Sequence, residues 1–333
     1  MKILFIGDPH LRINRFNLGI ELFRWIEDII SKEKPDIVVN LGDTFHDHAI
    51  LRAELLEEFR NHVNNVAALA PYYYILGNHD QYKPKDAKYH ALQNFKNINN
   101  FHVIEETTEI SGLTMVPYIA DHSQFPLDTQ KICIAHQTFI GADYGYMRES
   151  AGVDAGKVKA DIIISGHVHK KQEFGKVVYP GIPYAQNAND VDQTKAILLF
   201  DTETYDKKWI YSPFPLWRSI TYEVSQDQPI DGLYEILNEE VNDKDHFIVK
   251  VIGPKAEIAA FLSSKKYKDI AKKTNIMPRP EFTDKDKKTV SLKSKDVKQV
   301  LKDCVDKIYD GGVNKDILTK ELMSLYDEAS INQ

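Results

Sequence analysis

The chain has only two cysteines among its 333 residues, Cys133 in a strand-like apolar run and Cys304 on a helix-like stripe. Because their contexts are unrelated, we expect both to be reduced core residues, which excludes a disulfide scaffold and favours an intracellular, cytoplasmic compartment. No apolar run approaches the roughly 18 residues of a membrane span, so no membrane association is expected. The start, MKILFIGD, has an apolar core too short for a signal peptide.

The chain also lacks internal repeats, low-complexity segments and a G-x-x-x-x-G-K-[ST] phosphate loop, so any dependence on ATP must come from a partner. Its net charge of −7 does not by itself indicate nucleic-acid binding. Residues 255–302, however, hold 14 Lys and Arg against six Asp and Glu, a local net charge of +8. This asymmetry allows a basic DNA-facing part beside an acidic, metal-holding part, although a solvated Lys-rich surface is the alternative.

Up to about residue 212, short apolar runs alternate with helical patterns. The runs typical of buried strands are ILFI (3–6), DIVVNL (36–41), YYYIL (72–76), KICIA (131–135) and DIIIS (161–165). Residues 16–33 and 50–69 show the apolar spacing of helices. Later runs, VVYPG, AILLFD and KWIYSPF, continue as strands without helices between them. The pattern predicts an α/β fold.

Each early strand is followed by polar groups, which are Asp8 and His10, then Asp43, then Asn78, His79 and Asp80, then His136, then His167 and His169. Ligands of open α/β folds collect beyond the carboxyl ends of strands, so these side chains are expected in one cleft. The pairs Asp8/His10 and His167/His169 are two residues apart, which points both members to one face of an extended chain. Carboxylate, imidazole and amide ligands without thiolate suit Mn²⁺, Fe²⁺ or Zn²⁺, and the set is too large for one ion.

In this order, the motifs GDPH, LGDTFHDH, LGNHD, IAHQ and SGHVH resemble the signature of the calcineurin-like metallophosphoesterase superfamily, over roughly the first 210 residues. The resemblance implies a two-sheet β-sandwich flanked by helices, with two divalent metal ions, of which Mn²⁺ is the first expectation. One ion would take Asp8, His10, Asp43 and His169. The other would take Asp43, Asn78, His136 and His167, with Asp43 as the bridge.

The resemblance also implies catalytic roles. His79 would face the scissile phosphate and protonate or stabilise the leaving oxygen, and Asp80 would hold its ring. Two ions would clamp the phosphate and acidify a water molecule. His46 resembles the extra histidine of the SbcD-type nuclease family, where it contacts the substrate phosphate. His48 has no such match and is expected at the surface. The alternative of a scaffold that has lost catalysis is disfavoured, because no ligand is missing.

Three further features resemble the SbcD-type family. Residues 180–184 resemble a loop near the active-site mouth, and residues 213–282 resemble its small α+β DNA-capping domain, following the nuclease domain at 1–212. Residues 283–292 form a charged linker. Residues 293–333 predict a helix–loop–helix with two apolar stripes, which in the family binds the coiled coil of an SbcC-like ATPase; docking back on the chain's own core is the alternative.

The sequence therefore predicts a metal-dependent nuclease subunit acting on DNA ends in recombination and repair. The resemblance implies 3′-to-5′ exonuclease activity on duplex DNA and endonuclease activity on single strands. A homodimer is expected, with the helix around 50–68 as the candidate interface, and the compact chain suggests a viral version acting in the host cytoplasm. The main alternative is a stand-alone phosphoesterase of nucleotides or small phosphodiesters.

Overall fold

The computed structural model describes residues 1–48, 51–83, 86–145, 147–283 and 319. The chain divides into two compact units, 1–281 and 282–333. The predicted linker at 283–292 and helical hairpin at 293–333 lie almost entirely outside the described residues, as does Cys304. None of the described helices is long and apolar enough to cross a membrane.

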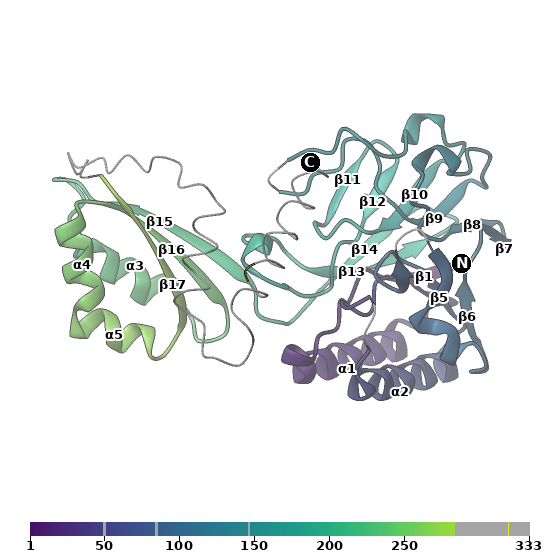
Figure 1. Cartoon of the computed structure of the whole chain (residues 1–333), viewed down its shortest axis with the longest axis horizontal. Coiled ribbons are helices and arrows are strands. Elements are labelled where there is room, and N and C mark those ends of the chain that lie inside the picture. The colour runs from purple at the N-terminus through teal and green to yellow at the C-terminus, as the bar shows by residue number, and fades with distance from the viewer. Residues whose placement is uncertain (49–50, 84–85, 146, 284–318, 320–333) are drawn as a thin grey trace. The chain divides into compact units, whose positions relative to one another are not determined.

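The first unit contains two six-stranded mixed sheets (Figure 1). The first has the order β14-β13-β1-β2-β3-β6, with bounds Lys207–Tyr211, Ala196–Asp201, Lys2–Ile6, Ile37–Asn40, Tyr72–Ile75 and Phe101–Ile104. The second has the order β11-β12-β10-β9-β8-β7, with bounds Gln172–Phe174, Val177–Tyr179, Ile162–Gly166, Ile132–His136, Leu113–Val116 and Thr108–Ile110. The five early strands and the later strand-only region are confirmed, and so is the α/β class.

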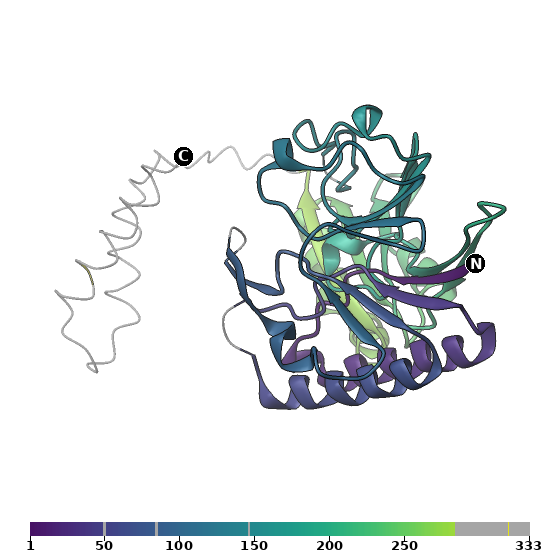
Figure 2. The same cartoon turned by 90° about the vertical axis from the view of Figure 1, so that its right-hand side faces the viewer.

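Alternation along β1 shows how the layers are built. Leu4 and Ile6 lie in a core cluster with the apolar faces of α1 (Phe16–Glu33) and α2 (Ala53–Leu69), whereas Ile3 and Phe5 lie in a second cluster with residues of the other sheet. Successive side chains of a strand point to opposite faces, so one strand serves both layers. Figures 1 and 2 show α1 and α2 side by side along the first sheet.

The parallel pairings fix where the functional loops emerge. In the first sheet, β1 pairs in parallel with β2, and β2 with β3. In the second, β9 and β10 are parallel neighbours. The carboxyl ends within each set therefore lie at the same edge of their sheet.

The region after residue 212 has a sheet of its own. Its order is β15-β16-β17, with bounds Trp217–Glu223, His246–Gly253 and Asn275–Phe282, and its helices are α3 (Gly232–Glu240), α4 (Lys255–Ser263) and α5 (Lys265–Ala271). A separate core cluster runs from Ile220 to Tyr267. The sequence predicted β15, α3, β16 and α4 but neither α5 nor β17. The boundary between domains at 212 and 213 stays a prediction.

The remaining elements are short. A hairpin of β4 (Gln81–Lys83) and β5 (Asp86–His90) follows the LGNHD motif. Among the described residues, 3₁₀ helices lie in the loops at Ile13–Arg15, Ala91–Phe95, His122–Gln124, Ala155–Lys157 and Ala188–Asp190.

Candidate metal centre

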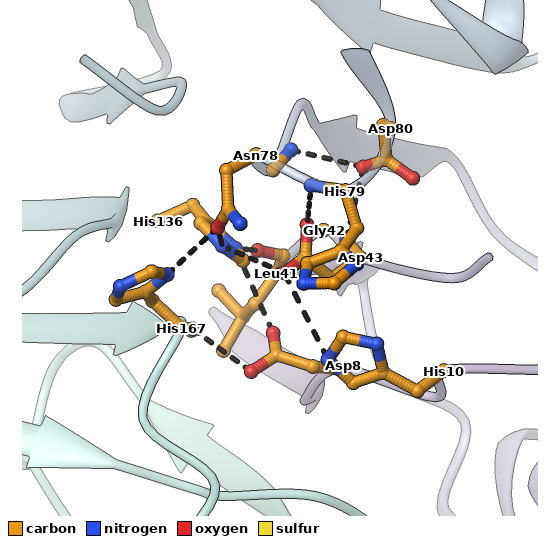
Figure 3. Close-up of polar contacts among 12 residues, drawn as sticks. Asp8, His10, Leu41, Gly42, Asp43, Asn78, His79, Asp80, His136 and His167 are labelled. Atoms are coloured by element: carbon orange, nitrogen blue, oxygen red, sulfur yellow. Dashed lines mark hydrogen bonds and ion pairs between the residues drawn. The ribbon is translucent and has the colours of Figure 1, made fainter. Parts of the chain in front are cut away.

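The predicted ligands converge from both sheets (Figure 3). Asp8, Asp43 and Asn78 follow β1, β2 and β3, whereas His136 ends β9 and His167 follows β10. Gly7 allows the first of these loops to form, because a Cβ there would overlap with the carbonyl oxygen of Gly181. The predicted loop at 180–184 thus packs directly against the start of the GDPH motif.

Within the described residues, three groups of side chains have ligand atoms that lie within 4.8 Å of one another. The first contains Asp8, His10 and His169, and the second contains Asp43, His136 and His167. A third group contains His10, His46 and His79, so His10 belongs to two groups. The assignment of these side chains to two ions stays a prediction. Oδ2 of Asp43 lies 3.3 Å from Nε2 of His136 and 3.8 Å from Nε2 of His10, so it faces a nitrogen of each group.

Asn78 completes the second group. Its Oδ1 lies 2.8 Å from Nδ1 of His167 and 3.1 Å from Nε2 of His136. His136 uses its other nitrogen, Nδ1, to contact the carbonyl of Leu41 at 2.6 Å. A metal-binding imidazole commonly donates its second N–H to such a carbonyl, which leaves Nε2 directed at the ion.

The donor atoms fit divalent cations. Nε2 of His10 and Nε2 of His169 face each other at 3.0 Å, and neither ring can donate at that contact if both offer lone pairs. Within the described chain, Oδ1 of Asp8 is buried and has no hydrogen-bond partner. Converging lone pairs and a lone buried carboxylate oxygen are stabilised by positive charge between them, and the set of carboxylate, imidazole and amide oxygen matches borderline metals.

The pKa values of these side chains are shifted by burial and by the charges of their neighbours. Burial, with help from Asp43 and against His136, raises the pKa of Asp8 to about 8. Burial lowers the pKa of His167 to about 3 and that of His169 to about 4, so both rings are neutral and can act as ligands. Although burial opposes it, the carboxylates of Asp43 and Asp8 raise the pKa of His136 to about 9. Binding of a divalent ion here would therefore release the protons that Asp8 and His136 hold in its absence.

Three of these residues have backbone conformations that L-amino acids rarely adopt. His10, Asp43 and His167 have φ angles of 44°, 51° and 80°. Positive φ at residues other than glycine costs roughly 1–2 kcal/mol each. Such outliers cluster at functional sites, where the surrounding structure holds them in place.

His79 lies against the first group, with its ring centroid 4.7 Å from that of His10. Its Nδ1 donates to the carbonyl of His46 at 2.7 Å, so Nε2 is the nitrogen left for a substrate. The prediction that Asp80 holds the His79 ring is wrong. Asp80 instead accepts hydrogen bonds from Tyr74 Oη and from the backbone N–H groups of Gly77 and Asp43. Its buried carboxylate therefore ties the two ligand loops together.

His46 lies against His79, and their rings stack with centroids 5.4 Å apart. Its predicted contact with the substrate phosphate stays a prediction. The sequence missed two neighbours. His48, expected at the surface, is half-buried and stacks on His79 at 4.2 Å, with Nδ1 facing the carbonyl of Gln81 at 3.3 Å. The Nη2 of Arg12 lies 3.2 Å from Nδ1 of His46. The sequence signals that could have placed these two residues in the site are the position of His48 at the end of the LGDTFHDH motif and that of Arg12 two residues after GDPH.

Comparisons with known proteins place these motifs in context. Residues 1–171 match the family model described as calcineurin-like phosphoesterase. The chain is 25% identical over 289 residues to "Putative phosphoesterase 078R" of Invertebrate iridescent virus 3, covering 81% of each chain. It is 30% identical over 196 residues to "Putative phosphoesterase 244L" of Invertebrate iridescent virus 6, covering 54% of this chain and 69% of the relative.

A third relative comes from a phage. The chain is 24% identical over 241 residues to "Exonuclease subunit 1" of Enterobacteria phage T4, covering 67% of this chain and 71% of the relative. Among solved structures, that of a novel archaeal phosphodiesterase aligns with a TM-score of 0.35 and 20% identity, covering 63% of this chain and 99% of the other.

Proposed function

Because the chain belongs to the calcineurin-like phosphoesterase family, which uses divalent metals, we propose that it is a two-metal phosphodiesterase that cleaves DNA. The observation that supports the phosphodiesterase part is the convergence of six Asp and His side chains in two adjoining groups. The ligand sets are those predicted above, namely Asp8, His10, Asp43 and His169 for one ion and Asp43, Asn78, His136 and His167 for the other. Mn²⁺ is the first candidate, and Fe²⁺ and Zn²⁺ are the others.

The chain's own side chains then have distinct tasks. Divalent ions bound at the two groups would supply charge neutralisation for the phosphate and acidify a water molecule. Nδ1–H of His79 is held by the carbonyl of His46, so Nε2 is the nitrogen that can exchange a proton. Donation to the leaving oxygen would come from Nε2–H of the imidazolium form, which becomes a neutral ring with its proton on Nδ1. Asp80 fixes the loops that carry Asp43 and His79.

His79→Asn tests this division of tasks. The variant should retain two ions per chain and bind DNA normally, because His79 is not a proposed ligand. Cleavage should fall at least about a hundredfold, the lower end of acid–base contributions. Wild-type turnover in the variant would remove His79 from the mechanism.

DNA is the substrate class that the phage relative favours. The similarity to the T4 exonuclease subunit covers 67% of the chain, which is more than the 171 residues of the family model. It therefore extends beyond the catalytic motifs. Lys265, Lys266 and Lys268 on α5 lie within the basic stretch noted above and are exposed, as phosphate-binding residues would be.

We extend the proposal to an SbcD-type nuclease subunit that processes DNA ends for recombination and repair. The activities would be 3′-to-5′ exonuclease on duplex DNA and endonuclease on single strands. The word "subunit" in the phage relative's name supports a partner. An SbcC-like coiled-coil ATPase, bound by residues 293–333, is that partner in this proposal, and α2 is the candidate interface of a homodimer.

The second candidate is a stand-alone phosphoesterase of nucleotides or small phosphodiesters, which the names of the two viral relatives favour. One experiment separates the two functions. The protein is incubated with Mn²⁺ and duplex DNA labelled at either the 3′ or the 5′ end, with closed circular single-stranded DNA, and with a small aryl phosphodiester.

A 3′-to-5′ exonuclease releases the 3′ label first as mononucleotide, whereas the 5′-labelled strand shortens gradually. Cleavage of the circle reports endonuclease activity, because a circle has no end. Asp43→Ala is the matched control for metal-dependent activity. Hydrolysis of the small ester without cleavage of either DNA would reject the nuclease and favour the second candidate.

A further inference from the structure

Arg12 is a half-buried arginine beside the candidate metal centre. Its Nη2 contacts His46, and its Nε is buried without a hydrogen-bond partner among the described residues. Within that part of the chain, Arg12 forms no ion pair with a carboxylate. Arg15 and Arg60 also have no carboxylate pair there and donate to backbone carbonyls, whereas Arg52 pairs with Glu54 and Arg218 pairs with Asp245. What distinguishes Arg12 is its contact with a histidine beside the candidate metal centre.

The backbone fixes this guanidinium near the ligands. Arg12 follows the proposed ligand His10 by two residues, and its neighbour Leu11 donates its N–H to the carbonyl of Thr44 at 2.7 Å. The N–H of His46 in turn donates to the carbonyl of Leu11 at 3.2 Å. The two loops are therefore joined through both the N–H and the carbonyl of Leu11, directly before Arg12, which limits how far the Arg12 backbone can move.

His46 connects Arg12 with the histidines of the candidate metal centre. Its ring centroid lies 5.5 Å from that of His10 and 5.4 Å from that of His79. A guanidinium only donates, so Nδ1 of His46 accepts from Arg12 and the proton of a neutral ring resides on Nε2. His46 is thereby a hydrogen-bond donor, which suits contact with a phosphate oxygen better than metal ligation.

A cation that is partly removed from water and has no counter-charge costs free energy, and a bound anion lowers that cost. Guanidinium groups match the geometry of phosphate through parallel N–H donors. The structure provides Arg12 with a neutral imidazole and no carboxylate, and the proposed reaction provides a phosphodiester at the neighbouring histidines. We propose that Arg12 binds a non-bridging oxygen of the scissile phosphodiester, with His46 as the second donor to the same phosphate; this inference rests on the proposed phosphodiesterase function.

The test removes the charge and keeps a polar side chain. In Arg12→Gln, the amide nitrogen stands about where Nε of Arg12 stands, so the contact of Nη2 with His46 is lost together with the charge. With a small aryl phosphodiester and Mn²⁺, kcat/KM should fall about 10²- to 10³-fold, the range for loss of one preorganised donor to the reacting group. The metal content should stay at two ions per chain, and the melting temperature should match that of the wild type. Arg52→Gln is the control, because that guanidinium pairs with an exposed glutamate.

Chemical rescue separates substrate binding from a structural role. In Arg12→Ala, added guanidinium ion should restore activity at least about tenfold, and it should not stimulate the wild type or Arg52→Gln. An Arg12→Gln variant within about threefold of the wild type would overturn the inference while the phosphodiesterase proposal stands. Loss of metal or of folding in both variants would also overturn it, since Arg12 would then support the loops. A wild-type protein that hydrolyses neither the small ester nor DNA would overturn both proposals.

Discussion

Replacing Asp80 by alanine should destabilise the protein and loosen the metal centre together. Asp80 is buried, and its carboxylate accepts from the N–H groups of Asp43 and Gly77 at 2.9 Å each and from Tyr74 Oη at 2.8 Å. Alanine leaves three buried donors without their partner, and each such donor costs about 1–3 kcal/mol. Water can enter the space left by the carboxylate, so the lower part of that range, about 3–5 kcal/mol in all, is expected.

For a unit of this size, a loss of 3–5 kcal/mol lowers the melting temperature by roughly 6–20 °C. The melt is recorded by circular dichroism with a chelator and again with Mn²⁺. Because Asp43 loses the bond to its N–H, the Mn²⁺-dependent increase in melting temperature should shrink as well. Metal analysis of the purified variant gives an independent measure of the same loss.

Asp80→Asn is the matched control. Burial, with the nearby Asp43, raises the pKa of Asp80 to about 7, so a neutral group is tolerated there. The amide oxygen can accept from both N–H groups, and the amide nitrogen can donate to Tyr74 Oη. This variant should therefore keep its stability, its metals and most of its activity. If Asp80→Ala melts within about 2 °C of the wild type, or if a fully stable Asp80→Asn loses about a hundredfold in rate, the structural role assigned to Asp80 is refuted.

Three other outcomes are expected. Asp43→Ala should lose both ions, whereas His10→Ala should weaken mainly one; two ions retained in Asp43→Ala by metal analysis would contradict the bridge. Burial lowers the pKa of His62, so the stability that its neutral ring contributes is complete above the unfolded pKa of about 6.5 and is lost as pH falls toward the folded value. Melting temperatures from pH 7 to 5 should therefore fall less steeply in His62→Gln than in the wild type. An unchanged slope would show that His62 does not contribute to the pH dependence of stability. Deleting residues 293–333 should leave the melting temperature and basal Mn²⁺-dependent cleavage intact while abolishing binding to the proposed ATPase partner. A large drop in melting temperature would mean that this segment belongs to the enzyme's own core.

The strand-end rule explains why so much of the site was predictable. Asp8, Asp43 and Asn78 each follow an apolar run, and parallel pairing of β1, β2 and β3 brings such positions to one edge whatever the loops do. His136 and His167 follow the same rule on the second sheet. A residue placed by the sheet itself can be located from sequence.

The roles of Arg12, His48 and Asp80 could not be located in that way. Their side chains lie on loops, and each has a partner on a segment more than 30 residues away, as between Arg12 and His46, His48 and Gln81, or Asp80 and Asp43. The motif placed Asp80 beside His79 in sequence, but the carboxylate turns toward the backbone of Gly77 and Asp43. Neighbouring positions do not decide which way a loop side chain points.

The elements missed after residue 253 have local causes. In β17, Pro278 and Pro280 argue against a strand, because proline removes backbone donors. β17 is an edge strand in the order β15-β16-β17, where proline is tolerated. The Lys-rich sequence of α5 lacks a clear apolar helical pattern. The helix begins after Ser264, and the Ser264 side chain caps it by accepting a hydrogen bond from the N–H of Tyr267.

The positive φ angles of His10, Asp43 and His167 lower the stability of the fold at residues that the proposed reaction needs. Glycine at any of these positions would relax the backbone and remove the ligand, so the inactive variant should be easier to fold once metal is chelated. A population selected only for thermal stability would therefore drift toward loss of the metal centre. Activity must be selected alongside stability in any attempt to improve this protein, because three of its strained residues are ones that its proposed reaction needs.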